Sequence, residues 1–387
     1  MNLKRTAIVA AVAASLALTG TAFAGGVTYK DGDNYVKVGG RIQLQYVISD
    51  PAGGSSTDML WFRRFRPYIE GSTHTGWAGK FQFDLGKAED GNEVAVKDAY
   101  MQYKGFDNVK LTIGNAKSTF SREALTSSKK QQLVERTFVG DHNYGSLDRT
   151  TGLHVTGHND DKNIEWAAQF AVAAVDPDQN KLDFDSVAND AADWNQGFVV
   201  GARVDFHPFG QLKKSQGDFK GEQKATIGLG AFTWSNDGDN NSYDGVGGTP
   251  SVSKADVDQV TGIEVSAAYR NAGFSVDAQY NSFEADTVDA TRTGGIYQNG
   301  TTTLTHYAVE GGYMVLPETL EVVAGYQVQD ADGYATEWAR TSVGLNYFVE
   351  GHDIKFQLTH RMGEGKDGAT GPGGELDETF LQAQFVF

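Results

Sequence analysis

From residue 36 to the last residue, the chain is a series of short segments in which apolar and polar residues alternate with a period of two. This alternation is typical of β-strands with two different faces, because successive side chains of a strand point to opposite sides. The first segment places Ile42 and Leu44 on one face and Arg41 and Gln43 on the other. Sixteen such segments are centred near residues 41, 65, 82, 99, 111, 155, 168, 202, 229, 265, 278, 310, 324, 344, 357 and 383. No segment of helical period interrupts them, so we expect an all-β fold.

The connections between these segments fall into two classes that alternate along the chain. The short class, rich in Gly, Asn and Asp as turns require, comprises residues 71–76, 105–108, 157–163, 271–273, 316–319 and 350–353. The long class comprises residues 49–59, 86–93, 115–150, 173–197, 235–260, 284–305, 329–339 and 362–378. We therefore predict a sixteen-stranded antiparallel transmembrane β-barrel with short periplasmic turns and long extracellular loops.

One connection breaks this rule. Residues 207–223 join the eighth and ninth segments on the side of the short turns, but they are long and carry Lys213, Lys214 and Lys220.

Both ends of the chain are those expected of an exported barrel. A basic pair precedes an apolar stretch that ends in Ala22-Phe23-Ala24, which is typical of a signal peptide and its cleavage site. We predict that residues 1–24 are a signal peptide and that residues 25–387 form a single transmembrane barrel. The final segment ends in Phe387, similar to the signal by which bacterial outer-membrane barrels are recognised for assembly. The expected location is the outer membrane of a Gram-negative bacterium.

The charge of the chain excludes some partners. With 50 acidic and 33 basic residues, its formal net charge is −17, which would repel the phosphates of a nucleic acid. Much of the negative charge lies in predicted outer loops such as residues 236–239 and 256–258. Outer-membrane lipid and lipopolysaccharide are the expected surroundings.

Aromatic residues near strand ends predict a girdle at the two membrane interfaces, where Tyr and Trp are favoured. On the apolar face we place Tyr46, Trp61, Trp77, Tyr103, Tyr269, Tyr313, Tyr326 and Tyr347.

A barrel of sixteen strands leaves a water-filled lumen, so its lining charges decide what passes. Basic residues dominate the polar face of the first five segments, with Lys37, Arg41, Arg64, Arg66, Lys80, Lys104 and Lys110, interrupted by the acidic residues Glu70, Asp84 and Asp98. The third long loop, residues 115–150, is expected to fold inward and carries Lys117, Arg122, Lys129, Lys130 and Arg136 against fewer acids. Fixed cations raise the local concentration of anions. The later segments are mixed, because Arg203, Lys355 and Arg361 face inward with Glu165, Asp205, Glu264, Asp277 and Glu321.

Several motifs resemble the phosphate-selective porin O/P family. They are Gly39-Gly40-Arg41-Ile42-Gln43, Phe62-Arg63-Arg64-Phe65-Arg66, Ile69-Glu70-Gly71 with Trp77, Val96-Lys97-Asp98-Ala99-Tyr100, and Leu125-Thr126-Ser127-Ser128-Lys129 with Glu135-Arg136. The resemblance implies a sixteen-stranded homotrimer in which lumen arginines draw anions toward a lysine-lined constriction. By the same resemblance, Arg41, Arg63 and Arg64 correspond to the arginines and Lys129 to the constriction lysine. Arg63 and Arg64 have opposite parity, so a β-bulge is required for both to reach the lumen.

The pattern departs from the family after Trp77, where Ala78 replaces a possible lysine and Lys80 follows two residues later. The candidate pore residues are Arg41, Arg63, Arg64, Arg66, Lys80, Lys129, Lys130, Arg136 and Arg203. We find no motif for catalysis or for a cofactor. His154 and His158 lie four residues apart on a strand, which separates them by roughly 13 Å and excludes a shared metal.

Three functions remain open from the sequence. The first is passive diffusion of small anions, such as phosphate or related oxyanions. The second is a general or cation-preferring porin, which the net charge and the acidic later segments favour. The third is a structural or adhesion barrel with negligible conductance.

Overall fold

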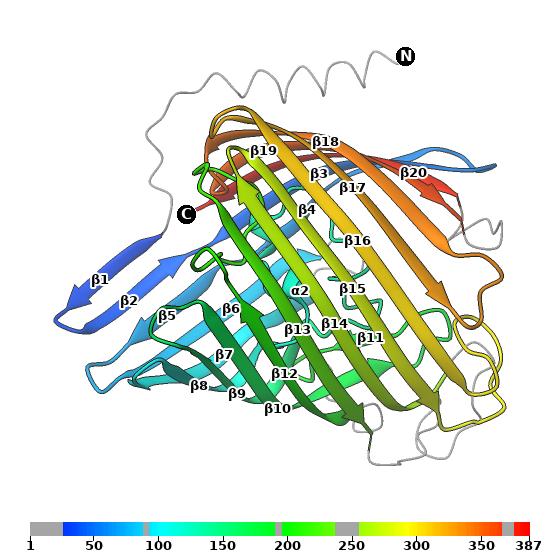
Figure 1. The fold of residues 1–387 in the computed structure, drawn as a ribbon, viewed down its shortest axis with the longest axis horizontal. Helices are drawn as coiled ribbons and strands as arrows, with labels where there is room; N and C mark the ends of the chain where they lie inside the picture. The colour runs from blue at the N-terminus through cyan, green and yellow to red at the C-terminus, as the bar shows by residue number, and fades with distance from the viewer. Residues whose placement is uncertain (1–25, 88–92, 190–195, 237–254, 366–374) are drawn as a thin grey trace.

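The computed structural model of the protein describes residues 26–87, 93–189, 196–236, 255–365 and 375–387 (Figure 1). The predicted signal peptide, residues 1–24, and the acidic stretch at residues 237–239 lie outside these ranges. No helix in the described residues is both long enough and apolar enough to cross a membrane.

The described residues form one antiparallel sheet of twenty strands. The strands are β1 (Val27–Asp31), β2 (Asn34–Gly39), β3 (Arg41–Pro51), β4 (Thr57–Phe65), β5 (Tyr68–Ser72), β6 (Trp77–Lys87), β7 (Glu93–Phe106), β8 (Val109–Lys117), β9 (Arg149–His158), β10 (Ile164–Asp176), β11 (Asp183–Asp185), β12 (Gln196–Phe206), β13 (Lys224–Ser235), β14 (Val257–Asn271), β15 (Phe274–Thr287), β16 (Thr301–Leu316), β17 (Leu320–Ala331), β18 (Trp338–Glu350), β19 (Ile354–Glu364) and β20 (Leu376–Val386). Two short helices, α2 (Arg122–Leu125) and η2 (Ser128–Lys130), lie between β8 and β9.

The sheet closes into a barrel because β20 pairs with β3. Closure is what a sheet in lipid requires, because an open edge would leave backbone N–H and C=O groups without partners. Each of the sixteen predicted segment centres falls within a strand. The described sheet contains more strands because β2 and β3 are separated only by Gly40, β4 and β5 only by Arg66 and Pro67, and β1 and β11 are short additions paired with β2 and β10. Figure 1 shows the β1–β2 hairpin projecting beyond the barrel wall.

The two faces of the strands are arranged as a membrane protein requires. Apolar side chains of the outer face are exposed, including Phe170, Phe198, Ile227 and Val309. Polar side chains of the alternate positions are buried inside, as in β3, where Gln43 and Gln45 are at most 1% exposed. The apolar surface therefore faces lipid and the polar surface faces the lumen.

The ladder between β3 and β4 contains the bulge that the sequence requires. The register passes from Gln43 opposite Arg64 to Leu44 opposite Phe62, so Arg63 is the extra residue. Because of this extra residue, the residues of β4 that precede Arg63 point to the opposite faces from those that simple alternation predicts. The placement of Trp61 on the outer face was therefore wrong, because its indole Nε1 donates a 3.0 Å hydrogen bond to the lumen-facing Gln45.

The turns and loops differ modestly from their predicted limits. The first outer connection is shorter than residues 49–59, because β3 continues to Pro51 and β4 begins at Thr57.

Between β14 and β15, Ala272 and Gly273 form a two-residue turn with φ of 50° and 85°. Positive φ at both positions is the requirement of a type I′ hairpin turn.

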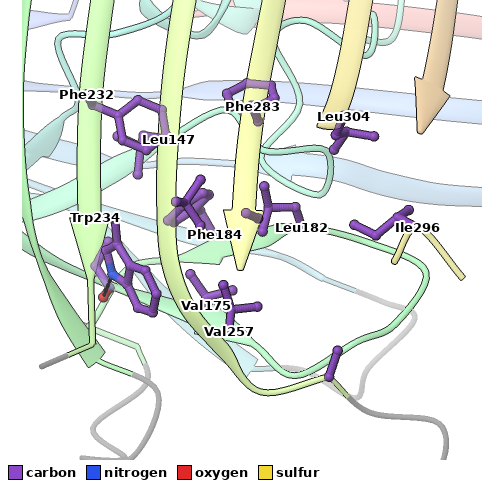
Figure 2. Packing of buried hydrophobic residues seen from close by; sticks show 14 of the residues in the cluster. Leu147, Val175, Leu182, Phe184, Phe232, Trp234, Val257, Phe283, Ile296 and Leu304 are labelled. Atoms are coloured by element: carbon purple, nitrogen blue, oxygen red, sulfur yellow. Dashed lines mark hydrogen bonds between the residues drawn. The ribbon is translucent and has the colours of Figure 1, made fainter. Parts of the chain in front are cut away.

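An apolar cluster fills the long-loop end of the barrel interior (Figure 2). It joins the inner faces of β10 and β12–β17 to Phe120 and Leu147 of the third loop and to Leu182 and Phe184 around β11. Apolar burial is the dominant favourable term in packing, so this cluster holds the outer loops against the wall.

Candidate functional site

The third loop, residues 118–148 between β8 and β9, lies inside the barrel. Its helix α2 begins at Ser121, whose hydroxyl accepts a hydrogen bond from the Ala124 amide. The same hydroxyl donates to the backbone carbonyl oxygen of Val139 at 3.0 Å, which connects the first part of the loop to its second half. Side chains of the opposite wall then bind the loop backbone, since Asn346 and Gln357 both donate to the carbonyl oxygen of Gln132.

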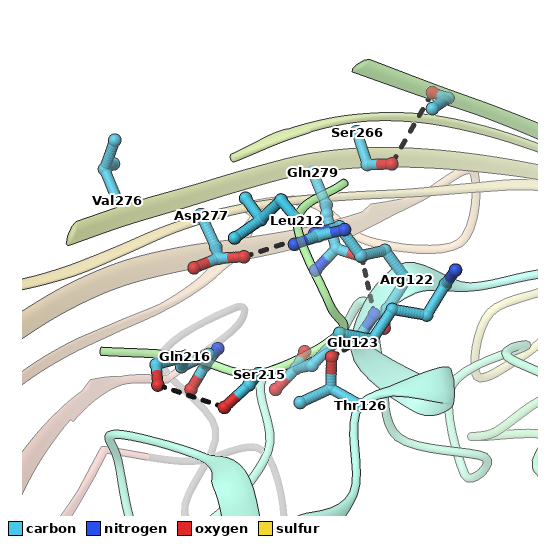
Figure 3. A network of polar contacts seen from close by, with 12 residues as sticks. Arg122, Glu123, Thr126, Leu212, Ser215, Gln216, Ser266, Val276, Asp277 and Gln279 are labelled. Carbon is cyan, nitrogen blue, oxygen red and sulfur yellow. Dashed lines mark hydrogen bonds and ion pairs between the residues drawn. The ribbon is translucent and has the colours of Figure 1, made fainter. Parts of the chain in front are cut away.

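Three acidic residues of the later strands hold this loop in place. Asp277 accepts a hydrogen bond from the guanidinium of Arg122 at 3.2 Å (Figure 3). Glu264 accepts from the backbone amide of Arg122 at 2.9 Å. Glu321 accepts from the Gln132 side chain at 2.6 Å. These carboxylates are 6%, 1% and 0% exposed, respectively. They are therefore covered by the loop and do not face the aqueous path.

The loop is also attached to β4 on the other wall. Arg63, the bulged residue, pairs with Glu135 at 2.8 Å, and Arg64 lies 3.9 Å from the same carboxylate. Burial alone would raise the pKa of Glu135, but the charges of Arg63 and Arg64 and the hydrogen bonds from Arg63 and Gln45 lower it to about 2. This carboxylate consequently remains ionised, and the attachment persists, through the range of pH above about 4.

The space left by the third loop is a cavity of about 640 Å³ beside β3, β5–β10, β12 and the end of β20. We call it the pore cavity. It reaches the short-turn end of the barrel, where Asn108 and Lys162 line it. Eleven basic residues line it: Arg41, Arg66, Lys80, Lys110, Lys117, Lys129, Arg136, Arg149, Lys162, Arg203 and Lys214. Only Asp98, Glu165 and Asp205 line it as acids.

The charges of this lining are paired unequally. All three carboxylates have cationic partners: Asp98 pairs with Lys80 and Arg149, Glu165 with Lys214, and Asp205 with Arg203 and Lys214. By contrast, within the described part of the chain, no carboxylate oxygen lies within 4.0 Å of the cationic nitrogens of Arg41, Lys110, Lys117, Arg136 or Lys162. The uncompensated charge of the pore cavity is therefore positive.

Three of these unpaired cations meet at one short stretch of the third loop. Lys117 donates to the carbonyl oxygens of Leu125 and Thr126 at 3.1 and 3.2 Å. Arg136 donates to the Thr126 carbonyl at 2.9 Å, and Arg41 donates to the hydroxyl of Ser127 at 3.2 Å. The Nε–H groups of Arg41 and Arg136 are buried and have no partner among the described residues. The uncompensated charges of these three residues suit an anion.

Six of the nine predicted pore residues line the pore cavity, namely Arg41, Arg66, Lys80, Lys129, Arg136 and Arg203. The other three are Arg63, Arg64 and Lys130, which are outside its lining. Arg63 and Arg64 instead contact Glu135, and the carbonyl oxygen of Lys130 accepts a hydrogen bond from the Gln216 amide. Lys129 lines the cavity but is 3.4 Å from Asp353, and burial lowers its pKa.

Five further cations of the lining were not among the candidate residues. Lys110 and Lys117 belong to the basic excess of the early segments and of the loop, which was the available signal. Lys162 and Lys214 lie in turns, where alternation gives no direction. Arg149 has the parity of the lipid-facing Leu153, but as the first residue of β9 it pairs with Asp98 inside the lumen.

A group near the long-loop end has the composition of a metal site. His142, Asp183 and Asp185 each offer a ligand atom, and these atoms lie within 4.8 Å of one another. His142 contacts Asp183 at 2.9 Å. Burial alone would lower the pKa of His142, but the hydrogen bond and charge of Asp183 raise it to about 9. In this structure His142 and Asp183 form an ion pair between the third loop and β11, and binding of a metal here would require loss of the imidazole proton.

Comparison with known proteins gives a family match. The family model described as phosphate-selective porin O and P matches residues 36–387. Porin O of Pseudomonas aeruginosa is 30% identical over 147 residues, which cover 33% of this chain and 34% of that protein. The chain thus spans about a third of the length of this curated relative.

Solved structures show the same fold. An anion-selective porin from Comamonas acidovorans has a TM-score of 0.60 at 12% identity and covers 92% of this chain and 100% of its own. OmpF of Salmonella typhi has a TM-score of 0.62 at 14% identity, and the match covers 93% of this chain and 100% of the OmpF chain. The trimer form of OmpT, an outer membrane protein of Vibrio cholerae, has a TM-score of 0.57 at 14% identity, covering 91% and 99%. At these identities the likeness concerns the fold alone.

Proposed function

This chain belongs to the phosphate-selective porin O and P family, and from that premise we propose that it forms an outer-membrane pore for the passive diffusion of small anions. The observation that carries the proposal is the unequal pairing of charge in the pore cavity. Every lining carboxylate has a cationic partner, whereas Arg41, Lys110, Lys117, Arg136 and Lys162 have no carboxylate partner in the described residues. Fixed positive charge in a confined lumen attracts anions and repels cations.

The stretch around Thr126 and Ser127 is the proposed anion-binding position. Lys117 has its three ammonium protons directed to three backbone carbonyls, so it supplies charge rather than a free donor. Arg41 and Arg136 donate only to neutral oxygen atoms of the third loop, so their guanidinium charges are not offset there. Three uncompensated cations at one position attract an oxyanion such as phosphate.

A cation-preferring pore is the runner-up. It rests on the net charge and on the acidic later strands, but Glu264, Asp277 and Glu321 are covered by the third loop. A structural or adhesion barrel is the third possibility and predicts negligible conductance. We propose a channel rather than an enzyme, because the chain belongs to a porin family and has the fold of solved porins. A homotrimer is proposed as well, which the trimer of the similar Vibrio cholerae barrel supports.

The test is the zero-current potential of the purified protein in a lipid bilayer under a KCl gradient, repeated with phosphate added. We expect anion preference and a reduction of chloride current by phosphate. Arg41→Gln and Arg136→Gln should each lower the anion-to-cation permeability ratio roughly threefold, the effect of one unit charge several ångströms from the path. Lys130→Gln, also in the third loop but outside the cavity lining, is the matched control. Cation preference of the native protein, or no conductance, would contradict the proposal.

A further inference from the structure

The long turn of residues 207–223, which joins β12 to β13 at the periplasmic end, enters the lumen. Gln216, 2% exposed, lies at its centre. Its backbone amide donates to the backbone carbonyl oxygen of Lys130 at 3.0 Å, and its side-chain oxygen accepts from the backbone amide of Gln132 at 2.7 Å. Its side-chain nitrogen donates to Glu310 of β16 at 2.7 Å. The turn is thus fixed both to the third loop and to the far wall.

Further contacts hold both flanks of the turn. Arg270 of β14 donates to the Ser215 carbonyl at 2.9 Å, and the Gly273 amide donates to Asp218 at 2.8 Å. Phe219 packs edge-on against Phe348 with ring centroids 4.8 Å apart. Figure 3 draws Ser215 and Gln216 in the same polar network as Arg122 of the third loop. The turn therefore fills the side of the lumen that the pore cavity does not use.

The start of the turn, in contrast, borders the pore cavity. Gln211 and Lys214 line it, and two of the three lining carboxylates, Glu165 and Asp205, stand beside them. The Lys214 ammonium lies 3.1 Å from Asp205 and 3.4 Å from Glu165. Gln211 donates a hydrogen bond to Glu165 as well. One ammonium group from the turn therefore bridges two carboxylates of the wall.

The other cations nearby cannot replace this charge. Arg203 pairs with Asp205 at 2.7 Å but also with Glu264 at 2.6 Å, so its single charge is divided between two acids. Glu165 has no lysine or arginine partner other than Lys214 within 4.0 Å among the described residues. Loss of Lys214 would leave Glu165 with only the buried imidazole of His207, 3.5 Å away, which carries a charge only when protonated. An exposed carboxylate near the periplasmic end would repel anions that leave or enter the cavity there.

We propose that Lys214, carried into the lumen by the 207–223 turn, is a specificity-determining residue of the pore. Its ammonium offsets part of the negative charge of Glu165 and Asp205 and so lowers the repulsion that anions meet at the periplasmic end of the cavity. The inference rests on the proposed anion-pore function and names a residue outside the third loop that the function requires. It also gives a reason for the one periplasmic turn whose length departs from the rule.

The test uses the full-length protein in bilayers under a KCl gradient, with Lys214→Met to keep the bulk of the side chain. The anion-to-cation permeability ratio should fall roughly threefold. Lys213→Met is the matched control, because the adjacent Lys213 is exposed and does not line the cavity. Adding Glu165→Gln to Lys214→Met should restore most of the native permeability ratio. Glu165→Gln alone should have a permeability ratio equal to or higher than that of the native protein.

The outcomes separate the inference from the function beneath it. If the native protein prefers cations, the proposed function fails. If the native protein prefers anions but Lys214→Met behaves as Lys213→Met does, only the role of Lys214 is overturned. The role of Lys214 would also be overturned if Lys214→Met lowered the permeability ratio and the added Glu165→Gln did not restore it. That result would indicate a merely structural role of Lys214. Should Lys214→Met fail to assemble, a lower anion preference in Glu165→Gln alone would be the contradicting result.

Discussion

A charged side chain in the lumen acts on a passing ion only to the extent that no neighbour already balances its charge. Arg203 and Arg136 both line the pore cavity, but Arg203 is paired with Asp205 and Glu264. Arg136 donates only to neutral carbonyl oxygens. An anion in the cavity therefore experiences much more of the charge of Arg136 than of Arg203. Residue type alone does not distinguish the two, and this is why Arg203 is a weaker candidate than its sequence position indicates.

The contact of His142 with Asp183 predicts a pH dependence at the long-loop end. The folded-state pKa of His142 is about 9, above its ordinary 6.5. The stabilisation from this ion pair is thus complete below about pH 6.5 and is lost as the pH rises through about 9. Hydrogen exchange of the Phe184 and Gly145 amides, which bond across the third loop and β11, should accelerate over that range beyond the intrinsic rate.

The matched variant for this prediction is His142→Gln, which cannot be protonated. In this variant both amides should exchange at the rate that the native protein reaches at high pH. After correction for intrinsic exchange, that rate should not depend on pH. Equal pH dependence in the native and variant proteins would show that His142 does not hold the two segments together.

At the scale of strands, alternation of apolar and polar residues was sufficient to find the wall of the barrel. It worked because a strand between lipid and water must keep one kind of side chain on each face. It failed where a single inserted residue changes the parity, as for Trp61 ahead of the bulge at Arg63. The family resemblance indicated that a bulge was needed, but only the register shows which residues it turns inward.

Strand alternation also gave no indication of the apolar cluster inside the outer end of the barrel, because its residues come from loops and strand ends. Phe120 is 1% exposed and contacts Phe232 and Phe283 with ring centroids 4.8 and 5.7 Å apart. Phe120→Ala should lower the free energy of unfolding by about 3 kcal/mol, through lost burial and the cavity left behind. Urea unfolding in detergent, followed by tryptophan emission, measures this change.

Phe209→Ala is the control for this substitution, since Phe209 is 47% exposed. A change within about 0.5 kcal/mol is expected there. If Phe120→Ala proved no more destabilising than Phe209→Ala, the cluster would contribute nothing to holding the third loop.

For the whole molecule, net charge was a poor guide to the pore. The chain carries a formal net charge of −17, yet the unpaired charge of the pore cavity is positive. The sequence identified the acidic residues Glu264, Asp277 and Glu321 as facing inward, and they do. It could not reveal that the third loop covers them, because that depends on contacts between residues more than a hundred positions apart, such as Arg122 with Asp277.

Selectivity carried by unpaired cations in a water-filled cavity should weaken with salt. The distance over which such charges act falls from roughly 30 Å at 0.01 M to about 10 Å at 0.1 M and about 3 Å at 1 M salt. With a constant tenfold KCl gradient, the anion-to-cation permeability ratio should therefore be highest in the most dilute solutions and approach the ratio of free mobilities in the most concentrated. The zero-current potential across this series measures it. A ratio independent of concentration would mean that direct binding of the anion to groups of the lining, rather than the electrostatic field of the lining, selects the anion.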